Sequence, residues 1–291
     1  MSAPPTSTSR CAGAALLLVL WIIVLLTGLI AVFALTARTE GLQGRYLGRS
    51  VVARGAAETG VDVAAMHLQG LDPAQRWIPD GRANQFDFEG HRLEVRVIDE
   101  GGKVDLNFAP PELLVGLLTA VGVEQDKARA LSGAIQDWRD EDDLVNLEGG
   151  AEDSAYTAAK LPYGAKDRPF EAISELRLVL GMDAALYRKL RPYITLFSGQ
   201  ARPDPAYAAA AVLRAMGMTP EQVDAALDQR QSATLPGSPL AAGGSGTYSI
   251  SSRATRPDGT RVQVQAAIRM GGGGGFGQLY LPLSWRVGES D

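Results

Sequence analysis

A long uncharged run near the start of the chain constrains its fold more than any other feature. Cys11 to Ala37 reads CAGAALLLVLWIIVLLTGLIAVFALTA, and an arginine closes it on each side. At about 1.5 Å per helical residue, the run exceeds the roughly 30 Å hydrocarbon core of a bilayer. A cleaved secretory signal has an apolar region of only about 7–15 residues, and no A-x-A site follows here. A buried core helix is the soluble alternative, but hydrophobicity on every face favours a membrane helix over 14–37.

Little of the chain precedes this run. Residues 1–10 are polar and rich in Pro, Ser and Thr. We therefore expect the N-terminus to stay inside and the body of the chain to lie outside, although the flanking charges give only a weak bias. The net charge of −5 argues against nucleic acid as a main partner. The single cysteine, Cys11, excludes an intrachain disulfide.

Helical periodicity continues beyond Ala37 and predicts one helix from about Ala14 to Gly70. Small and apolar residues recur at spacings of mostly three and four. They are Leu42, Tyr46, Ala53, Ala57, Val61, Ala64, Leu68 and Leu71. Because this stripe makes 38–72 amphipathic, that part of the helix must be buried against another element.

Two hairpin patterns flank a helical middle region. FDFEGHRLEVRVID alternates around Glu89-Gly90, and TYSISSRATRPDGTRVQVQAAIRM alternates around Pro257 to Gly259. GGKVDLN gives a short strand, and LYLPLSWRV gives a last edge strand. Strands at 73–108 and 236–291 that are split by an insert most economically rejoin into one sheet on the long helix. The predicted fold class is therefore α+β, with a C-terminal tail after the last strand.

The insert, 109–235, is predicted to be an all-α domain of helical hairpins. Three segments share a glycine and an apolar residue between two helices, at Gly122, Gly181 and Gly217. Glycine just past a helix end supplies the left-handed C′ position. Such hairpins also suggest a DNA-binding helix-hairpin-helix, which grips phosphate after Gly-apolar-Gly. The third position is instead Glu124, Asp183 or Thr219, so we expect no nucleic acid.

Over about residues 10–285 the chain resembles protein K of the general (type II) secretion pathway, a minor pseudopilin. The resemblance rests on Gly13 before AALLLVLWIIVLL, DEGGKVDLN, DWRDEDD followed by GGAEDSAY, PFEAISELRLVLGMDAALYRKLRPYITLFSG, and the terminal QAAIRM. It is looser at LRAMGMTPEQVDAALDQRQ, where ARPDPAY replaces the usual Asn-rich entry. The resemblance implies a pilin-like helix packed on a small antiparallel sheet, with a large all-α domain inserted between strands.

The resemblance also implies a processing site and a place of assembly. A prepilin peptidase would cut after Gly13, removing leader 1–13, and Ala14 would be N-methylated. Most pilin-like subunits carry Glu at the fifth mature position, which here is Leu18, and protein K members typically lack it. A subunit without that buried carboxylate has no pairing to make with a subunit ahead of it. The resemblance therefore implies a position at the pseudopilus tip, together with other minor pseudopilins. It also implies a single-pass protein of the Gram-negative inner membrane, with a cytoplasmic N-terminus and a periplasmic body.

Carboxylates crowd the stretch from Asp137 to Asp153, where Arg139 is the one positive charge. Oxygen ligands without His or Cys favour Ca²⁺ over zinc, although the EF-hand spacing is absent. From the residues alone, a solvated acidic face is the alternative, but the family resemblance implies Ca²⁺ in this loop. The predicted ligands of this structural ion are Asp140, Asp142, Asp143, Glu148, Glu152 and Asp153.

No Ser/His/Asp, Cys/His or paired-carboxylate pattern stands out in the sequence, so we expect no enzymatic activity. His91 is expected to be exposed in the first hairpin. Two functions remain. The first is a filament subunit that initiates the pseudopilus and supports export of folded proteins across the outer membrane. The second is a membrane-anchored helix-hairpin-helix module that binds calcium or nucleic acid outside a secretion filament.

Overall fold

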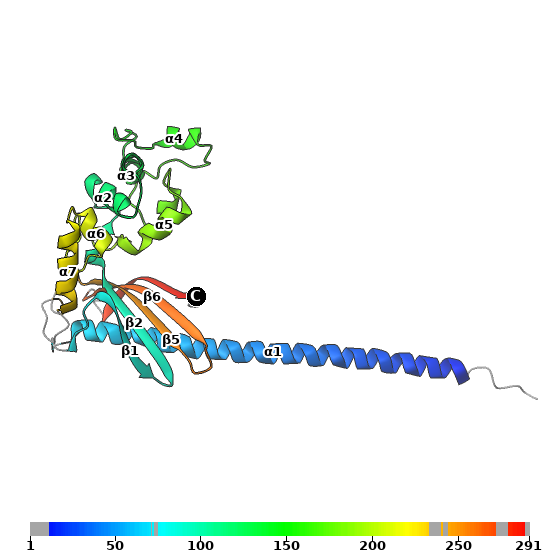
Figure 1. Cartoon of the computed structure of the whole chain (residues 1–291). Coiled ribbons are helices and arrows are strands. Elements are labelled where there is room, and N and C mark those ends of the chain that lie inside the picture. Colours follow the sequence, from blue (N-terminus) through cyan, green and yellow to red (C-terminus); the bar gives the residue numbers. More distant parts are fainter. Residues whose placement is uncertain are drawn as a thin grey trace, which may run out of the picture. The chain divides into compact units, whose positions relative to one another are not determined.

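The computed structural model describes residues 12–70, 72, 75–232, 240, 244–271 and 279–288 (Figure 1). Most of the predicted leader, with Cys11, and the predicted stripe residue Leu71 lie outside these residues. The chain divides into two compact units, Met1–Val52 and Ala53–Asp291.

A single helix, α1 (Ala12–Gln69), confirms the predicted long helix. In the first unit, Leu16–Glu40 is long and apolar enough to cross a membrane, with a mean hydropathy of 3.1 and no burial within the protein. The hydroxyls of Thr27 and Thr36 donate to the carbonyls of Ile23 and Val32, one turn earlier. These polar groups are therefore satisfied inside the helix, as a bilayer requires.

The second unit contains a five-stranded antiparallel sheet in the order β1-β2-β5-β6-β7. Its strands are β1 (Asp80–Phe88), β2 (His91–Asp99), β5 (Thr247–Thr255), β6 (Arg261–Met270) and β7 (Tyr280–Gly288). β2 pairs with β5 across the whole insert, which confirms that the two hairpins rejoin in one sheet. The β1–β2 turn has positive φ at Glu89 and Gly90, as the predicted two-residue turn requires.

One face of the sheet is covered by the part of α1 that begins at Ala53. Small residues of α1 lie in the same core as Leu93, Val95, Val97, Ile250 and Val264; they are Ala56, Ala57, Val61, Ala64 and Ala65. The expected exposure of His91 is wrong, since only 4% of it is exposed. Alternate residues of β2 point toward α1, and His91 begins that alternation.

The inserted domain contains six α-helices among the residues described, of which α4 and α6 have six residues each. They are α2 (Pro111–Ala120), α3 (Gln125–Arg139), α4 (Asp153–Ala158), α5 (Ala184–Leu190), α6 (Ala210–Ala215) and α7 (Pro220–Ser232). Gly122, Gly181 and Gly217 have φ of 95°, 85° and 88°, so the predicted left-handed positions are confirmed. Glu124 and Asp183 accept backbone N–H groups of the helices that follow, which assigns their carboxylates to capping.

Two details of the insert differ from prediction. The domain is not entirely α, because β4 (Ile194–Thr195) pairs in parallel with β3 (Val104–Asp105) in a separate two-stranded sheet. The predicted boundary 73–108 placed β3 in the main sheet. The structure places β3 in the small sheet instead. The first helix of the second hairpin is a 3₁₀ helix, η3 (Ile173–Leu178). Two-residue strands and a six-residue 3₁₀ helix are too short to show a clear hydrophobic period.

The insert is fixed to the sheet by two buried carboxylates at η2 (Glu100–Gly102). Asp99 accepts the N–H groups of Gly101 and Ser245, at 2.7 and 2.8 Å. Glu100 pairs with Lys103 at 2.5 Å and accepts the hydroxyls of Thr195 in β4 and Ser249 in β5. The contacts of Glu100 thus join β4 of the insert's small sheet, and Lys103 just before β3, to β5 of the main sheet.

Replacing Gly60 with Val should lower the free energy of unfolding by about 1–3 kcal/mol, because overpacking a tight contact costs that much. A carbon added at Gly60 would overlap Ser252 Oγ and lie 3.1 Å from Val95 Cγ2. Urea unfolding of a form that starts after the apolar run, followed by circular dichroism, measures the change. Gly55→Ala is the control, since nothing lies within 4 Å of its added carbon. Equal losses in the two variants would contradict the packing.

Candidate cation site

The acidic stretch folds back on itself between α3 and α4. Asp137 lies near the end of α3, Asp140 is its C-cap, and Glu152 is the N-cap of α4. The returning loop is held by Asp137 Oδ2, which accepts the N–H of Asn146 at 3.2 Å. Gly150 permits the approach, since a side chain there would overlap Asp137. The two ends of the acidic stretch are thereby brought close together.

Four carboxylates in this region each leave a buried oxygen without a hydrogen-bond partner. The atoms are Asp137 Oδ1, Asp140 Oδ1, Glu152 Oε1 and Asp167 Oδ1. Asp137 has no exposed surface, and only 5% of Glu152 is exposed. A buried carboxylate without a partner is costly unless it becomes protonated or meets a cation. These orphaned oxygens are a donor set of the kind that Ca²⁺ prefers.

The pKa values show that these groups share one electrostatic environment. Burial, followed by the charges of Asp137 and Asp167, raises the pKa of Glu152 to about 7. Burial is the main reason that the pKa of Asp140 is raised, and Asp137 adds to the effect. Burial and then Asp153 and Asp143 raise the pKa of Asp167. The negative charges therefore disfavour one another until protons or a cation neutralise them.

The predicted ligands fall into two groups. Asp140 and Glu152 each carry one of the orphaned oxygens. Asp142 and Asp143 are exposed, and Asp142 Oδ1 accepts the N–H of Leu144. Asp153 Oδ1 accepts the N–H of Ala165 at 3.1 Å.

Glu148 is exposed and makes no side-chain contact that places it with the cluster. Over the described ranges, no group of three or more His, Cys, Asp or Glu side chains already has a metal-binding arrangement. The calcium site therefore stays a prediction.

Sequence reasoning did not select Asp137 or Asp167 as ligands. Asp137 was counted among the acids, and its place three residues before Asp140 on the last turns of α3 could have identified it. Asp167 lies in the loop after α4 and has a positive φ of 53°. Nothing in its local sequence distinguishes it, since only the folding of the following loop brings it to Glu152.

The predicted processing residues Gly13 and Ala14 lie in the first turn of α1. Leu18 is 60% exposed, and the other large apolar side chains of this span are exposed to a similar degree. The span therefore presents apolar side chains on all sides, which fits a lipid or helix-bundle environment.

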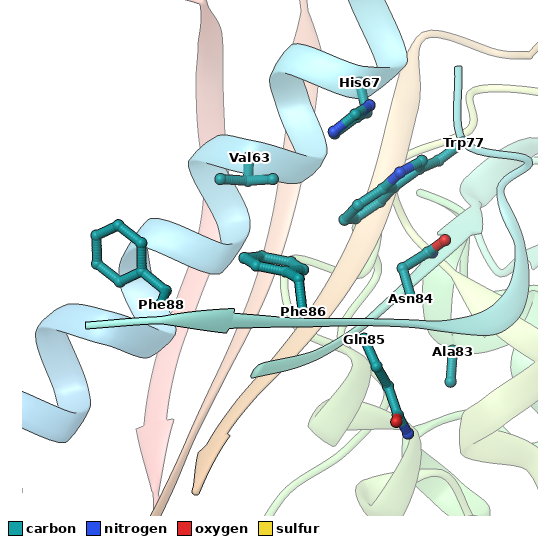
Figure 2. A pocket seen from close by; sticks show the side chains of 8 residues that line it. All are labelled: Val63, His67, Trp77, Ala83, Asn84, Gln85, Phe86 and Phe88. Atoms are coloured by element: carbon teal, nitrogen blue, oxygen red, sulfur yellow. The ribbon is translucent and has the colours of Figure 1, made fainter. Parts of the chain in front are cut away.

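A hollow of about 630 Å³ opens between α1 and the edge strand β1 (Figure 2). His67 stacks on Trp77 with ring centroids 4.7 Å apart, and Trp77 lies 6.2 Å from Phe86. Val63 and Phe88 complete its apolar wall. His67 is its one titratable lining residue, and His67 Nδ1 lies 2.8 Å from the carbonyl oxygen of Gln75. The hollow offers apolar surface and does not pair an acid with a base.

Comparison with known proteins shows which family this chain resembles. Residues 98–199 match the family model of type II secretion system (T2SS) protein K. The resemblance to the protein K family is thus confirmed. Proteins of that name from Klebsiella pneumoniae and Pseudomonas aeruginosa are 34% and 32% identical over 134 and 152 residues. These matches cover 42% and 49% of this chain, and 40% and 45% of the relatives, so the aligned part is less than half of their length.

A solved structure has the same fold. It is that of the GspK-GspI-GspJ complex from the enterotoxigenic Escherichia coli Type 2 Secretion System. The match has a TM-score of 0.55 and 20% identity, and covers 87% of this chain and 99% of the other. The predicted α+β pseudopilin-like fold is confirmed.

Without divalent cations, the stability of the protein should fall as the pH rises toward 8. The pKa of Glu152 is raised from 4.5 to about 7, so the folded state holds this proton more tightly than the unfolded state. The resulting stabilisation is complete below about pH 4.5 and is lost as the pH rises through about 7. Thermal melting in EDTA between about pH 5 and pH 8 measures it. Glu152→Gln should flatten this slope, whereas the exposed Glu148→Gln should keep it. An unchanged slope in Glu152→Gln would contradict the assignment.

Proposed function

We propose that this chain is a minor pseudopilin of a type II secretion system. It assembles with other minor pseudopilins at the pseudopilus tip, initiates the pseudopilus, and supports export of folded proteins across the outer membrane. The observation that carries this proposal is the protein K match over residues 98–199, in a chain whose fold is shared with a solved pseudopilin complex. The relative's complex contains GspI and GspJ, which supports similar subunits as partners here. The role is assembly, without an enzymatic step.

Two features support the tip position. Leu18 lies where most pilin-like subunits carry the glutamate that pairs with a neighbouring subunit, so nothing at this position requires a subunit ahead. The inserted domain between β2 and β5 adds bulk that a subunit within a helical filament would have to accommodate. A subunit at the end of the filament needs no partner ahead of it, and its inserted domain does not have to fit between other subunits.

The side chains of the apolar span suit two environments, first the membrane and then the filament core. Before assembly, Leu16–Glu40 holds the precursor in the inner membrane as a single pass, with a cytoplasmic N-terminus and a periplasmic body. A prepilin peptidase then cuts after Gly13, and Ala14 becomes the methylated N-terminus. The same apolar side chains next pack among neighbouring helices in the filament core.

Mass spectrometry of the protein from secreting cells should find a mature chain that begins with methylated Ala14. The physical reason is that the polar leader 1–13 would otherwise prevent the helix end from entering an apolar bundle. Co-purified pseudopilins should crosslink to cysteines introduced in the second unit.

An intact Met1 or Ser2 would contradict the proposal and favour the alternative, a membrane-anchored helix-hairpin-helix module outside a secretion filament. The capping roles of Glu124 and Asp183 already weigh against phosphate binding by such a module. Crosslinks distributed uniformly along assembled filaments would contradict the tip position while leaving pseudopilin membership intact. Leu18→Glu should damage assembly more than membrane insertion.

The acidic loop is proposed to hold a structural Ca²⁺ ion. Asp137, Asp140, Glu152 and Asp167 supply orphaned oxygens, and Asp142, Asp143 and Asp153 supply further negative charge around them. A bound divalent cation neutralises carboxylates whose mutual repulsion raises their pKa values. These residues would then pin the loop between α3 and α4 without taking part in any reaction.

Calcium should raise the melting temperature by about 5–10 °C when its concentration is about 100 times Kd. Asp137→Asn and Asp140→Asn should abolish this shift, and calorimetric titration should lose its Ca²⁺ heat. Glu148→Gln removes an exposed charge from the same loop and is the matched control, which should keep both signals. An absent Ca²⁺ heat in the unmodified protein, or an unchanged shift in Asp140→Asn, would end the proposal.

A further inference from the structure

The second face of the main sheet points away from α1, and the strand register fixes which residues lie on it. Residues that pair across strands share a face. Arg92 pairs with Thr255, which pairs with Arg261, and Glu94 pairs with Arg253. The next row contains Arg96 and ends at Arg286. All of these alternate with the side chains that are buried under α1.

This face is basic although the chain as a whole has a net charge of −5. Its arginines are Arg92, Arg96, Arg253, Arg261, Arg269 and Arg286. Its carboxylates are Asp87 and Glu94, which lie 3.7 Å from Arg92 and 3.1 Å from Arg96. Within the described part of the chain, no carboxylate lies within ion-pair distance of the other four arginines. Arg253 lies centrally among them, and its Nε is buried without a hydrogen-bond partner.

The arginines are close enough to act on one ligand. Arg253 has Arg92 and Arg261 as diagonal neighbours on the adjoining strands, a separation of about 7–8 Å between backbones. Five of the six side chains are exposed, and Arg253 is half-buried. Like charges at this spacing repel one another, so an anionic partner that spans them gains attraction and removes repulsion. The guanidinium fork favours carboxylate or phosphate groups bound through two hydrogen bonds.

The rest of the face favours carboxylates on a protein over other anions. The side chains between the arginines are Gln85, Ser251, Thr255, Gln263 and Gln265, which donate and accept hydrogen bonds. Nucleic-acid-binding sheets stack bases on aromatic side chains, and none of the paired residues on this face is aromatic. Membrane-binding surfaces insert large apolar side chains among their basic residues. The rows of Arg92, Arg253 and Arg286 contain none, and the row of Arg269 contains one, Leu281.

We propose that the arginine face of the sheet is a docking surface for an acidic, carboxylate-rich surface of another protein. The argument rests on charge complementarity, since the face concentrates positive charge on a chain that is negative overall. Arg253, Arg261 and Arg286 carry the recognition, because none of them forms an ion pair with a carboxylate of the described chain. The surface is independent of the cation site and of the protein's place in a filament.

The test uses the full chain in neutral detergent and a fluorescein-labelled peptide of alternating Glu and Thr. Fluorescence anisotropy should show saturable binding that weakens about ten-fold or more when salt rises from about 50 to 300 mM. The same peptide with Gln in place of Glu should not bind. Arg253→Gln/Arg261→Gln/Arg286→Gln should weaken binding of the Glu peptide about ten-fold or more.

The matched control removes the same charge from the inserted domain, with Arg188→Gln/Arg191→Gln/Arg202→Gln, all at exposed positions. It should bind within about two-fold of the unmodified chain. Since Arg253 is half-buried, the double variant Arg261→Gln/Arg286→Gln keeps the test valid if the triple variant does not fold.

Equal losses in the control and face variants would overturn the proposal. So would absent peptide binding together with arginine-dependent binding of phosphatidylglycerol vesicles or polyuridylate, which would assign the face to lipid or RNA.

Discussion

The buried carboxylates of Asp99 and Glu100 hold the point at which the inserted domain leaves the sheet. Buried acids persist where their oxygens are paired, and Glu100 is paired with groups from three different parts of the chain. Lys103 comes from the outgoing chain, Thr195 from the interior of the insert, and Ser249 from the returning strand β5. β2 and β5 can therefore remain hydrogen-bonded neighbours although the whole insert separates them in sequence.

With that junction fixed, the two faces of the sheet take opposite roles. One face carries Leu93, Val95 and Ile250 under the small residues of α1, where Gly60 allows close contact. The other face carries the arginines. The insert meanwhile gathers acids whose buried oxygens lack partners. Positive charge is thus concentrated on one face of the sheet, and buried negative charge is concentrated in the insert.

Much of this architecture follows from local patterns. The continuous helix α1, the turn at Glu89 and Gly90, and the left-handed glycines at Gly122, Gly181 and Gly217 each depend on a few neighbouring residues. Such elements can be predicted from the sequence because helix, strand and turn differ in the period of their apolar residues and in backbone φ. The pairing of β3 with β4 depends on contacts between distant segments, so no local pattern predicts it. His91 is in phase with the buried residues Leu93 and Val95, but its burial also requires α1 to cover that face of the sheet.

The sequence by itself determined that the chain has an apolar span, a helix to bury, rejoining hairpins and an acidic loop. These are properties of composition and period, which survive without tertiary contacts. Only the tertiary structure decided which acids lose their partners and which arginines share a face. Asp137 and Asp167 join Glu152 through chain reversals, and Arg253 meets Arg261 through strand register. Burial and charge proximity are properties of three-dimensional neighbours, and the order of residues along the chain does not encode them locally.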